Sequence, residues 1–464
     1  MYDAIVIGAG FAGLATARRL NQLGCGNLLV LEARDRVGGR TKHGVVAGMD
    51  IDLGGMWLGP TQTRLAEMAD ELGVQTYPTY LEGKGVFRIH GKEYLGERED
   101  LDGLFGLQDG ISYLSSRRKL GKLVAEIDCE QPWSHPKAAA LDAQTVEQWL
   151  LDNIRSERLK QLYRLLCFSL FCAETSQVSM LFFLHYIRSG DSLEVMVSAD
   201  AGGAQNFLFH GGVQQIARKM AEELADRVHL EEPVTAIRWS PDSAKVDSAT
   251  ATYEARRVIV CVPPTLVPKL DFSPPLPQPK AALHAKLAMG SAIKYWVAYD
   301  KPFWREQGFN GSIIRDDMPC SPCYDVSPPN QGRGLIAGFF DGDHALNHGD
   351  LSREERKERV LAMLAEHFGD AALSPLEYTD ADWTAETWSG GCYGAYAAPG
   401  IYARYGQWLR RPIGPLLWAG TETSPRWTGY IEGAIRSGEH AADLALASKG
   451  KDTVIPEPVM RIRG

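Results

Sequence analysis

The first forty residues constrain this chain more than any other stretch of it. Asp3–Ile7 is an apolar run typical of a buried parallel strand, and a helix-forming run from Phe11 to Leu23 follows it. Gly8, Gly10 and Gly13 form the pattern G-x-G-x-x-G at this junction. In such a turn the first glycine allows a tight bend, the second lets the backbone approach a pyrophosphate, and the third lets helix and strand pack closely. The helix N-terminus then offers free N–H groups and partial positive charge to phosphates.

A second expected strand, Asn27–Leu31, is followed directly by Glu32. An acid in this position is placed to hydrogen-bond a ribose 2′-hydroxyl, so the whole unit predicts a dinucleotide site. Two further glycine-rich stretches follow, Gly38-Gly39-Arg40 and Gly54-Gly55, and the arginine is available to a phosphate. Three backbone approaches within about sixty residues favour a large cofactor such as FAD over a nicotinamide.

Length and composition narrow the class of protein. A chain of 464 residues is too long for one compact core and is expected to form two or three lobes. The formal net charge of −9 argues against nucleic acid or an anionic membrane as a partner. No apolar run of about 18 residues occurs, and no signal peptide is expected before the first strand. The eight scattered cysteines are expected to be reduced thiols, which favours a cytoplasmic protein.

The character of the sequence alternates along the chain. Stretches that resemble the glycine-rich nucleotide-binding part return twice along the chain. They return first after a mainly helical part, which includes an expected helix over 104–127, and again after a part that contains strands. We therefore predict an α/β fold in which a Rossmann-like lobe is interleaved with an α+β lobe for substrate. The expected FAD-binding parts are 1–79, 210–285 and 388–448, the substrate-binding parts are 80–209 and 286–387, and 449–464 is a tail.

Six stretches carry a resemblance to a known family. They read IVIGAGFAGLATA, LEARDRVGGRT, LGGMWLG, GSAIKYWVAYDKPFW, ETWSGGCYGAYAAPG and LLWAGTETSPRWTGYIEGAIRSGEHAA. Through them the chain resembles the flavin amine oxidases, and monoamine oxidase in particular, over nearly its whole length. The resemblance implies a two-lobed FAD enzyme that holds its substrate at the flavin.

The resemblance also implies a set of FAD-binding residues. Besides the first glycines and Glu32, these are Ala33, Arg34, Gly39, Arg40, Gly54, Gly55, Met56, Trp57, Val234, Cys392, Gly420, Thr421, Glu422, Tyr430 and Ile431. The cysteine that matches Cys392 in monoamine oxidase is joined by a thioether to the 8α-methyl group of FAD. The alternative interpretation is a small buried core residue, since free cysteine is often found in cores.

Three residues are implied in catalysis. Tyr393 and Tyr430 match the two aromatic residues that flank the amine at the flavin, and π-faces attract an ammonium. Lys294 matches a lysine that holds a water at the flavin N5. On its expected strand, alternation places Lys294 on one face with Trp296, in an apolar stripe where a lysine needs a partner. The alternative for Lys294 is a snorkelling surface side chain.

The substrate wall is expected to include Phe168, Leu170, Val197, Gln205 and Tyr324, each with ordinary core packing as the alternative. Cys320-Ser-Pro-Cys323 has C-x-x-C spacing, but no second pair and no thioredoxin-like unit accompany it, so no metal site is predicted.

The resemblance implies FAD-dependent oxidative deamination of primary monoamines with aromatic or alkyl side chains, giving an aldehyde, ammonia and hydrogen peroxide from oxygen. A diamine or polyamine oxidase of the putrescine type, or an amine dehydrogenase with an acceptor other than oxygen, remains open. A homodimer is a family expectation, and the family's membrane anchor is not expected here.

Overall fold

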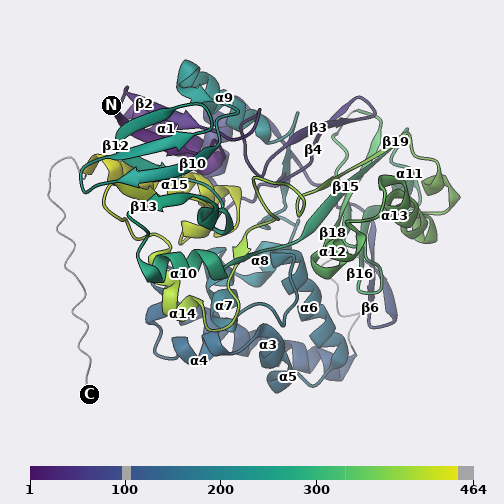
Figure 1. Ribbon diagram of the computed structural model, residues 1–464. Helices are drawn as coiled ribbons and strands as arrows, with labels where there is room; N and C mark the ends of the chain where they lie inside the picture. The colour runs from purple at the N-terminus through teal and green to yellow at the C-terminus, as the bar shows by residue number, and fades with distance from the viewer. Residues whose placement is uncertain (97–105, 330, 448–464) are drawn as a thin grey trace.

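The computed structural model describes residues 1–96, 106–329 and 331–447. In it the glycine-rich turn follows β1, a central strand of an eight-stranded sheet, at the carboxyl end of that strand (Figure 1). The strands run in the spatial order β13-β10-β11-β12-β1-β2-β9, with β21 also pairing with β12. β1 pairs in parallel with β2 and β12, so the carboxyl ends of these strands meet beside Gly8. In parallel sheets this edge is where ligands bind. The strands are β1 (Tyr2–Ile7), β2 (Leu28–Leu31), β9 (Val228–His229), β10 (Val234–Trp239), β11 (Ala244–Ser248), β12 (Thr252–Val260), β13 (Asp271–Ser273) and β21 (Leu416–Trp418).

Four helices accompany this sheet: α1 (Phe11–Gln22), α2 (Thr63–Glu71), α9 (Gln214–Leu224) and α15 (Ile431–Ala447). Small residues bring α1 and α15 close together. A Cβ atom at Gly438 would lie 2.2 Å from the carbonyl oxygen of Ala12, and the Thr16 hydroxyl donates to the Gly438 carbonyl at 3.0 Å. The first and last helices of the fold therefore pack against one another beside the same glycine turn.

A second sheet of seven strands lies on the other side of the molecule (Figure 1). Its spatial order is β19-β15-β18-β17-β16-β6-β7, and α11 (Phe303–Glu306), α12 (Gly342–His348) and α13 (Arg353–Phe368) accompany it. The predicted alternation on β15 is confirmed, because Tyr295 and Val297 pack in one buried cluster while Trp296 packs in another. The strands are β6 (Lys84–Ile89), β7 (Lys92–Gly96), β15 (Ala292–Tyr299), β16 (Phe309–Arg315), β17 (Cys323–Asp325), β18 (Gly334–Asp341) and β19 (Glu377–Asp382).

A layer of helices closes the bottom of the molecule in Figure 1. Several begin at a serine or threonine whose hydroxyl accepts a first-turn N–H, including Ser156 and Ser179. The layer contains α3 (Leu107–Ala125), α4 (Ala138–Ala143), α5 (Val146–Asn153), α6 (Glu157–Phe171), α7 (Met180–Ser189), α8 (Leu193–Val197), α10 (Gln278–Lys286) and α14 (Tyr402–Tyr405).

Three two-stranded pairs lie outside the two large sheets; the first is a local hairpin, and the other two join distant parts of the chain. They are β3 (His43–Val46) with β4 (Met49–Asp52), β5 (Thr76–Pro78) with β8 (Phe207–Phe209), and β14 (Ala288–Met289) with β20 (Ala395–Tyr396). The last pair places the chain just after Tyr393 against the chain just before β15.

The predicted fold class is confirmed: one sheet carries the nucleotide turn, and the other sheet with the helical layer is inserted between its parts. The lobe boundaries remain a prediction. The part after residue 80 was expected to be mainly helical, but it first forms the hairpin β6–β7. The strands of that hairpin are short, so their period is hard to detect in the sequence. The tail 449–464 and the start of the predicted helix 104–127 lie outside the described residues.

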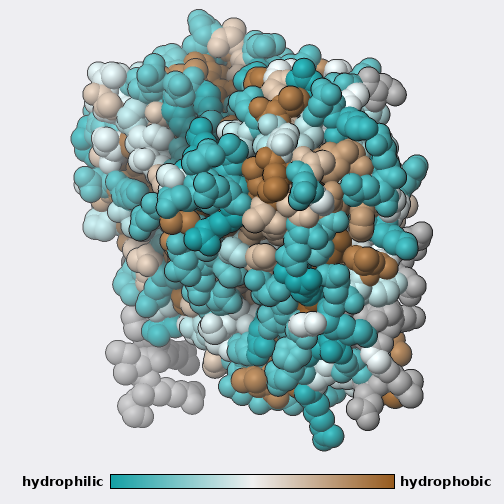
Figure 2. Space-filling model, turned by 90° about the vertical axis from the view of Figure 1, so that its right-hand side faces the viewer, coloured by the Kyte–Doolittle hydropathy of each residue, from teal (hydrophilic) through white to brown (hydrophobic). Residues whose placement is uncertain are grey.

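The surface on the side of the second sheet is mostly hydrophilic, with hydrophobic residues in small scattered groups (Figure 2). No helix among residues 1–96, 106–329 and 331–447 is long and apolar enough to cross a bilayer.

Candidate active site

One large cavity, of about 1250 Å³, runs from the glycine turn to the helical layer. Cavities for a single small ligand usually have volumes of about 300–1,000 Å³. This one therefore has room for a large cofactor and a second molecule. Most predicted site positions line it, namely Gly8, Gly10, Glu32, Ala33, Arg34, Gly39, Arg40, Gly54, Gly55, Met56, Trp57, Leu170, Val197, Gln205, Val234, Lys294, Tyr324, Cys392, Tyr393, Gly420, Thr421, Tyr430 and Ile431.

The end of the cavity beside β1 fits a dinucleotide. Gly10 is the N-cap residue of α1 and has no side chain, so no cap occupies the first N–H groups of the helix. Gly8 has a φ of +100°, and a Cβ atom at Gly13 would lie only 1.8 Å from the Gly8 carbonyl oxygen. Gly13 is thus a packing residue behind the turn rather than part of the lining. The Glu32 carboxylate is buried and accepts the Ala9 N–H at 2.7 Å, which holds it beside the turn.

The half-buried Arg40 and the buried Glu422 form an ion pair next to this end. Two guanidinium nitrogens of Arg40 donate to the two oxygens of Glu422 at 2.6 and 3.1 Å, and the first also donates to the Tyr393 carbonyl at 2.9 Å. Glu422 does not line the cavity, because its carboxylate is engaged by Arg40 and by the Ala395 N–H. The arginine therefore links the Gly38-Gly39-Arg40 loop to the loop that carries Cys392 and Tyr393.

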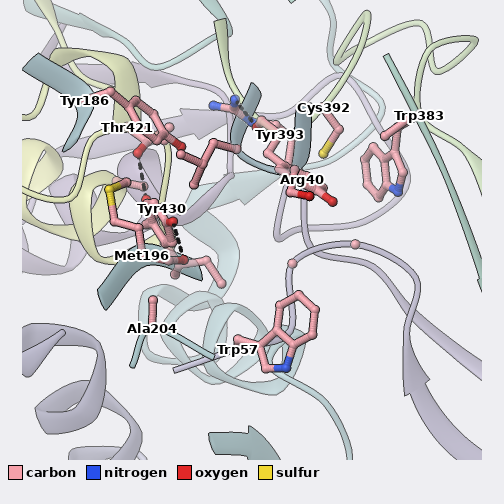
Figure 3. A pocket seen from close by; sticks show the side chains of 18 of the residues that line it. Arg40, Trp57, Tyr186, Met196, Ala204, Trp383, Cys392, Tyr393, Thr421 and Tyr430 are labelled. Atoms are coloured by element: carbon pink, nitrogen blue, oxygen red, sulfur yellow. Dashed lines mark hydrogen bonds between the residues drawn. The ribbon is translucent and has the colours of Figure 1, made fainter. Parts of the chain in front are cut away.

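Cys392 faces the cavity between Arg40 and Trp383 (Figure 3). It follows Gly391, whose φ is +136° and where a Cβ atom would lie 2.3 Å from the Gly290 carbonyl oxygen. Burial raises the pKa of the Cys392 thiol to about 12, and the charges of Arg40 and Lys294 oppose that rise. The peptide bond between Cys392 and Tyr393 is cis.

Tyr393 and Tyr430 both line the middle of the cavity, together with Tyr186 (Figure 3). The Tyr430 hydroxyl donates to the Met196 carbonyl at 3.3 Å, and the Tyr430 carbonyl accepts the Thr421 hydroxyl at 2.7 Å. The Tyr393 ring lies edge-on to Phe339, with 5.8 Å between the ring centres. Two aromatic side chains from different loops thus line the same cavity, and each is held by hydrogen bonds or ring contacts.

Lys294 is buried and is not a snorkelling surface residue. Its ammonium donates to the carbonyls of Asp52 and Gly54, both at 2.7 Å, and lies 2.9 Å from the Met56 sulfur. Burial lowers the pKa of Lys294, while the nearby Asp52 carboxylate opposes this shift. Asp52 itself accepts the Val213 N–H at 3.0 Å, which fixes the position of the compensating charge.

The far end of the cavity is mostly apolar and is formed by α3, α6 and α8. Leu170 on α6 and Val197 on α8 line it, whereas Phe168 points elsewhere and packs edge-on against His344. At the rim Arg117 and Glu194 form an ion pair at 2.6 Å that joins α3 to α8. This pair was not predicted, because nothing local in the sequence of either helix indicates that the two helices meet.

Neither cysteine of the C-x-x-C pair lines the cavity. Cys320 and Cys323 are fully buried, are not disulfide-bonded and pack in the core of the second lobe. Within the described ranges no group of three or more possible metal ligands occurs.

Comparison with known proteins identifies one family, whose members are named for different amines. The pattern of the family described as flavin containing amine oxidoreductase matches residues 11–446. The chain is 36% identical over 442 residues to "Probable flavin-containing monoamine oxidase A" of Dictyostelium discoideum, covering 94% of this chain and 96% of that protein. It is similar to cyclohexylamine oxidase from Brevibacterium oxydans IH-35A, with a TM-score of 0.92 and 31% identity over 97% of this chain and 100% of the other. It is also similar to putrescine oxidase bound to putrescine, with a TM-score of 0.91 and 31% identity over 96% and 99%.

Proposed function

Because the chain belongs to the family of flavin-containing amine oxidoreductases, we propose that it oxidises primary monoamines with aromatic or alkyl side chains. The products are an aldehyde, ammonia and hydrogen peroxide, with oxygen as the electron acceptor. The cofactor of this family is a flavin, and the dinucleotide end of the cavity fits FAD. When bound, FAD accepts the electrons and the hydrogen that leave the carbon next to the amine nitrogen.

The observation that carries the proposal is the position of Tyr393 and Tyr430 in the cavity. They line the cavity between its glycine-rich dinucleotide end and its apolar end, which is formed by helices. Their rings are suited to hold an amine nitrogen between two π-faces and to orient its neighbouring carbon. The apolar wall that includes Leu170 and Val197 suits an aromatic or alkyl side chain.

The charged residues of the cavity favour a monoamine over a diamine. Beyond the cofactor end, the carboxylates that line it are Asp191, Glu194 and Asp200. Glu194 pairs with Arg117, and Asp200 accepts the Ser198 hydroxyl at 2.8 Å. Asp191 lies 3.9 Å from the Arg426 guanidinium. Two of these three carboxylates already have an arginine beside them, which weakens their attraction for a second ammonium, so the putrescine-type activity remains the second candidate.

The substrate class is tested by anaerobic reduction of the enzyme's flavin. Benzylamine, phenylethylamine, an alkylamine, putrescine and an α-amino acid are added separately while the flavin absorbance is followed. We expect bleaching by the monoamines, with colour restored and peroxide formed when air is admitted. Bleaching by putrescine alone would establish the diamine activity, and slow recovery in air would indicate a dehydrogenase. A flavin that none of them bleaches would refute the substrate class.

The pH dependence follows from the cavity lining, which includes no histidine among the described residues, so we expect no side chain to act as a general base on the amine. Without such a base the enzyme selects the neutral amine, whose share rises about tenfold per pH unit below an ammonium pKa near 10. We expect kcat/KM for a monoamine to rise steeply between pH 6 and pH 8. The measurement is the rate of oxygen consumption at low amine concentration, and a flat profile over pH 6–9 would contradict selection of the neutral amine.

A further inference from the structure

Asp341 ends the strand β18 and is the N-cap residue of α12. Aspartate is favoured at this position because its carboxylate accepts N–H groups of the first helical turn. Here the carboxylate makes no such bond. It turns instead toward two residues of the active-site region, Cys172 and Tyr393.

The contacts of Asp341 are few and specific. One carboxylate oxygen accepts the Tyr393 hydroxyl at 3.5 Å, and the other accepts the Cys172 thiol at 3.3 Å. The first is a long hydrogen bond, of the kind that shortens when a ligand fills an active site. Asp341 has no exposed surface, and no ion pair of the described residues includes it.

A buried carboxyl without a cation is costly, since an unpaired charge in the interior loses its hydration. Burial accordingly raises the pKa of Asp341 to about 8, and the bonds from Cys172 and Tyr393 oppose the rise. The other residues of β18 are buried and mostly apolar, so an apolar side chain would satisfy the packing of this strand. Perturbed buried carboxyls of this kind are concentrated at functional sites.

We propose that Asp341 is a positioning residue, which holds the Tyr393 hydroxyl and so fixes the ring that faces the amine. The proposal rests on the function proposed above. Tyr393 is then held at both ends, because Arg40 binds its carbonyl and Asp341 binds its hydroxyl. Tyr430 is held in the same way by Thr421 and by the Met196 carbonyl. Because each ring is fixed at both ends, it does not have to move during the reaction and it keeps the amine aligned.

The test is a double-mutant cycle with the monoamine that bleaches the flavin fastest. Asp341→Leu removes the acceptor, and we expect kcat to fall about tenfold with KM changed less than about threefold. Asp341→Asn keeps an oxygen that accepts the hydroxyl, and we expect it to stay within about threefold of the wild type. In a Tyr393→Phe background the hydroxyl is absent, so Asp341→Leu is expected to have no further effect.

Asp380→Asn is the matched control. Asp380 is another buried carboxylate of the second sheet that accepts a tyrosine hydroxyl, from Tyr378 at 3.0 Å, and neither residue lines the cavity. Unlike Asp341 it also pairs with Arg356 at 2.8 Å, so Asp380→Asn is expected to lower stability as well. Rates are taken per bound flavin, and the control is expected to match the wild type. An equal loss from Asp341→Leu with and without the Tyr393 hydroxyl, or no loss at all, would overturn the proposal. If the proposed function itself were wrong, the wild type would turn over no amine, and this result is distinct from either outcome that overturns the role of Asp341.

Discussion

Replacing Cys392 with alanine is expected to remove a covalent bond between the protein and its flavin. Denaturation would then release the flavin, whereas the wild-type chain would keep it. Cys392 lines the cavity beside Lys294 and Tyr393, and Gly390 and Gly391 precede it without side chains that would screen it. Because burial holds the pKa of its thiol near 12, Cys392 is protonated in the free chain. Attachment is therefore expected only once FAD is bound against it.

The measurement is acid precipitation of the purified protein, followed by flavin fluorescence of the pellet and of the supernatant. Cys261→Ala is the control, because Cys261 also lines the cavity but lies beside Gly8, at the dinucleotide end. We expect wild type and Cys261→Ala to keep the flavin in the pellet and Cys392→Ala to lose all of it. Flavin released from the wild type would show that Cys392 is only a wall residue.

Local patterns predicted the part of the site that local geometry builds. The spacing of Gly8, Gly10 and Gly13 predicted the turn, because Gly8 has a φ of +100° and a side chain at Gly13 would collide with the nearby Gly8 carbonyl. Alternation placed Lys294 and Trp296 on the same face of β15, since neighbouring side chains of a strand point to opposite sides. Both inferences needed only the backbone geometry of one element.

Residues whose partners are distant in the chain were not predictable in this way. Glu432 lies in the first turn of α15, but its carboxylate accepts the N–H groups of Arg64 and Leu65 and so caps α2. Asp341 was also not predictable as a site residue. A carboxyl group at the end of the apolar strand GLIAGFFD is unusual and could have been noticed, but nothing in the sequence identifies Tyr393 as its partner. Such contacts depend on how whole elements pack together.

Lys294→Met is expected to slow the reaction with oxygen far more than the reaction with the amine. Oxygen gains negative charge as it takes electrons, and a fixed positive charge nearby stabilises that change. The ammonium of Lys294 is suited to this because it is buried in the cavity wall and is held by two carbonyls rather than by a direct carboxylate bond. The charge of Lys294 is compensated at longer range by Asp52, whereas the Arg40 guanidinium is bound directly by the Glu422 carboxylate.

Loss of one such preorganised group typically costs about 10²–10³ in rate. We therefore expect kcat/KM for oxygen to fall by about 10² or more in Lys294→Met, with anaerobic bleaching by a monoamine slowed less than about tenfold. Both rates are measured by stopped-flow absorbance of the flavin. Lys280→Met is the matched control, because Lys280 is equally buried and donates to the Trp408 carbonyl at 2.6 Å, but does not line the cavity. It should lower thermal stability and leave both rates per bound flavin unchanged. If Lys294→Met reacted with oxygen as fast as the control, the charge of Lys294 would have no part in the oxidase reaction, and its role would be confined to binding the Asp52–Gly54 loop.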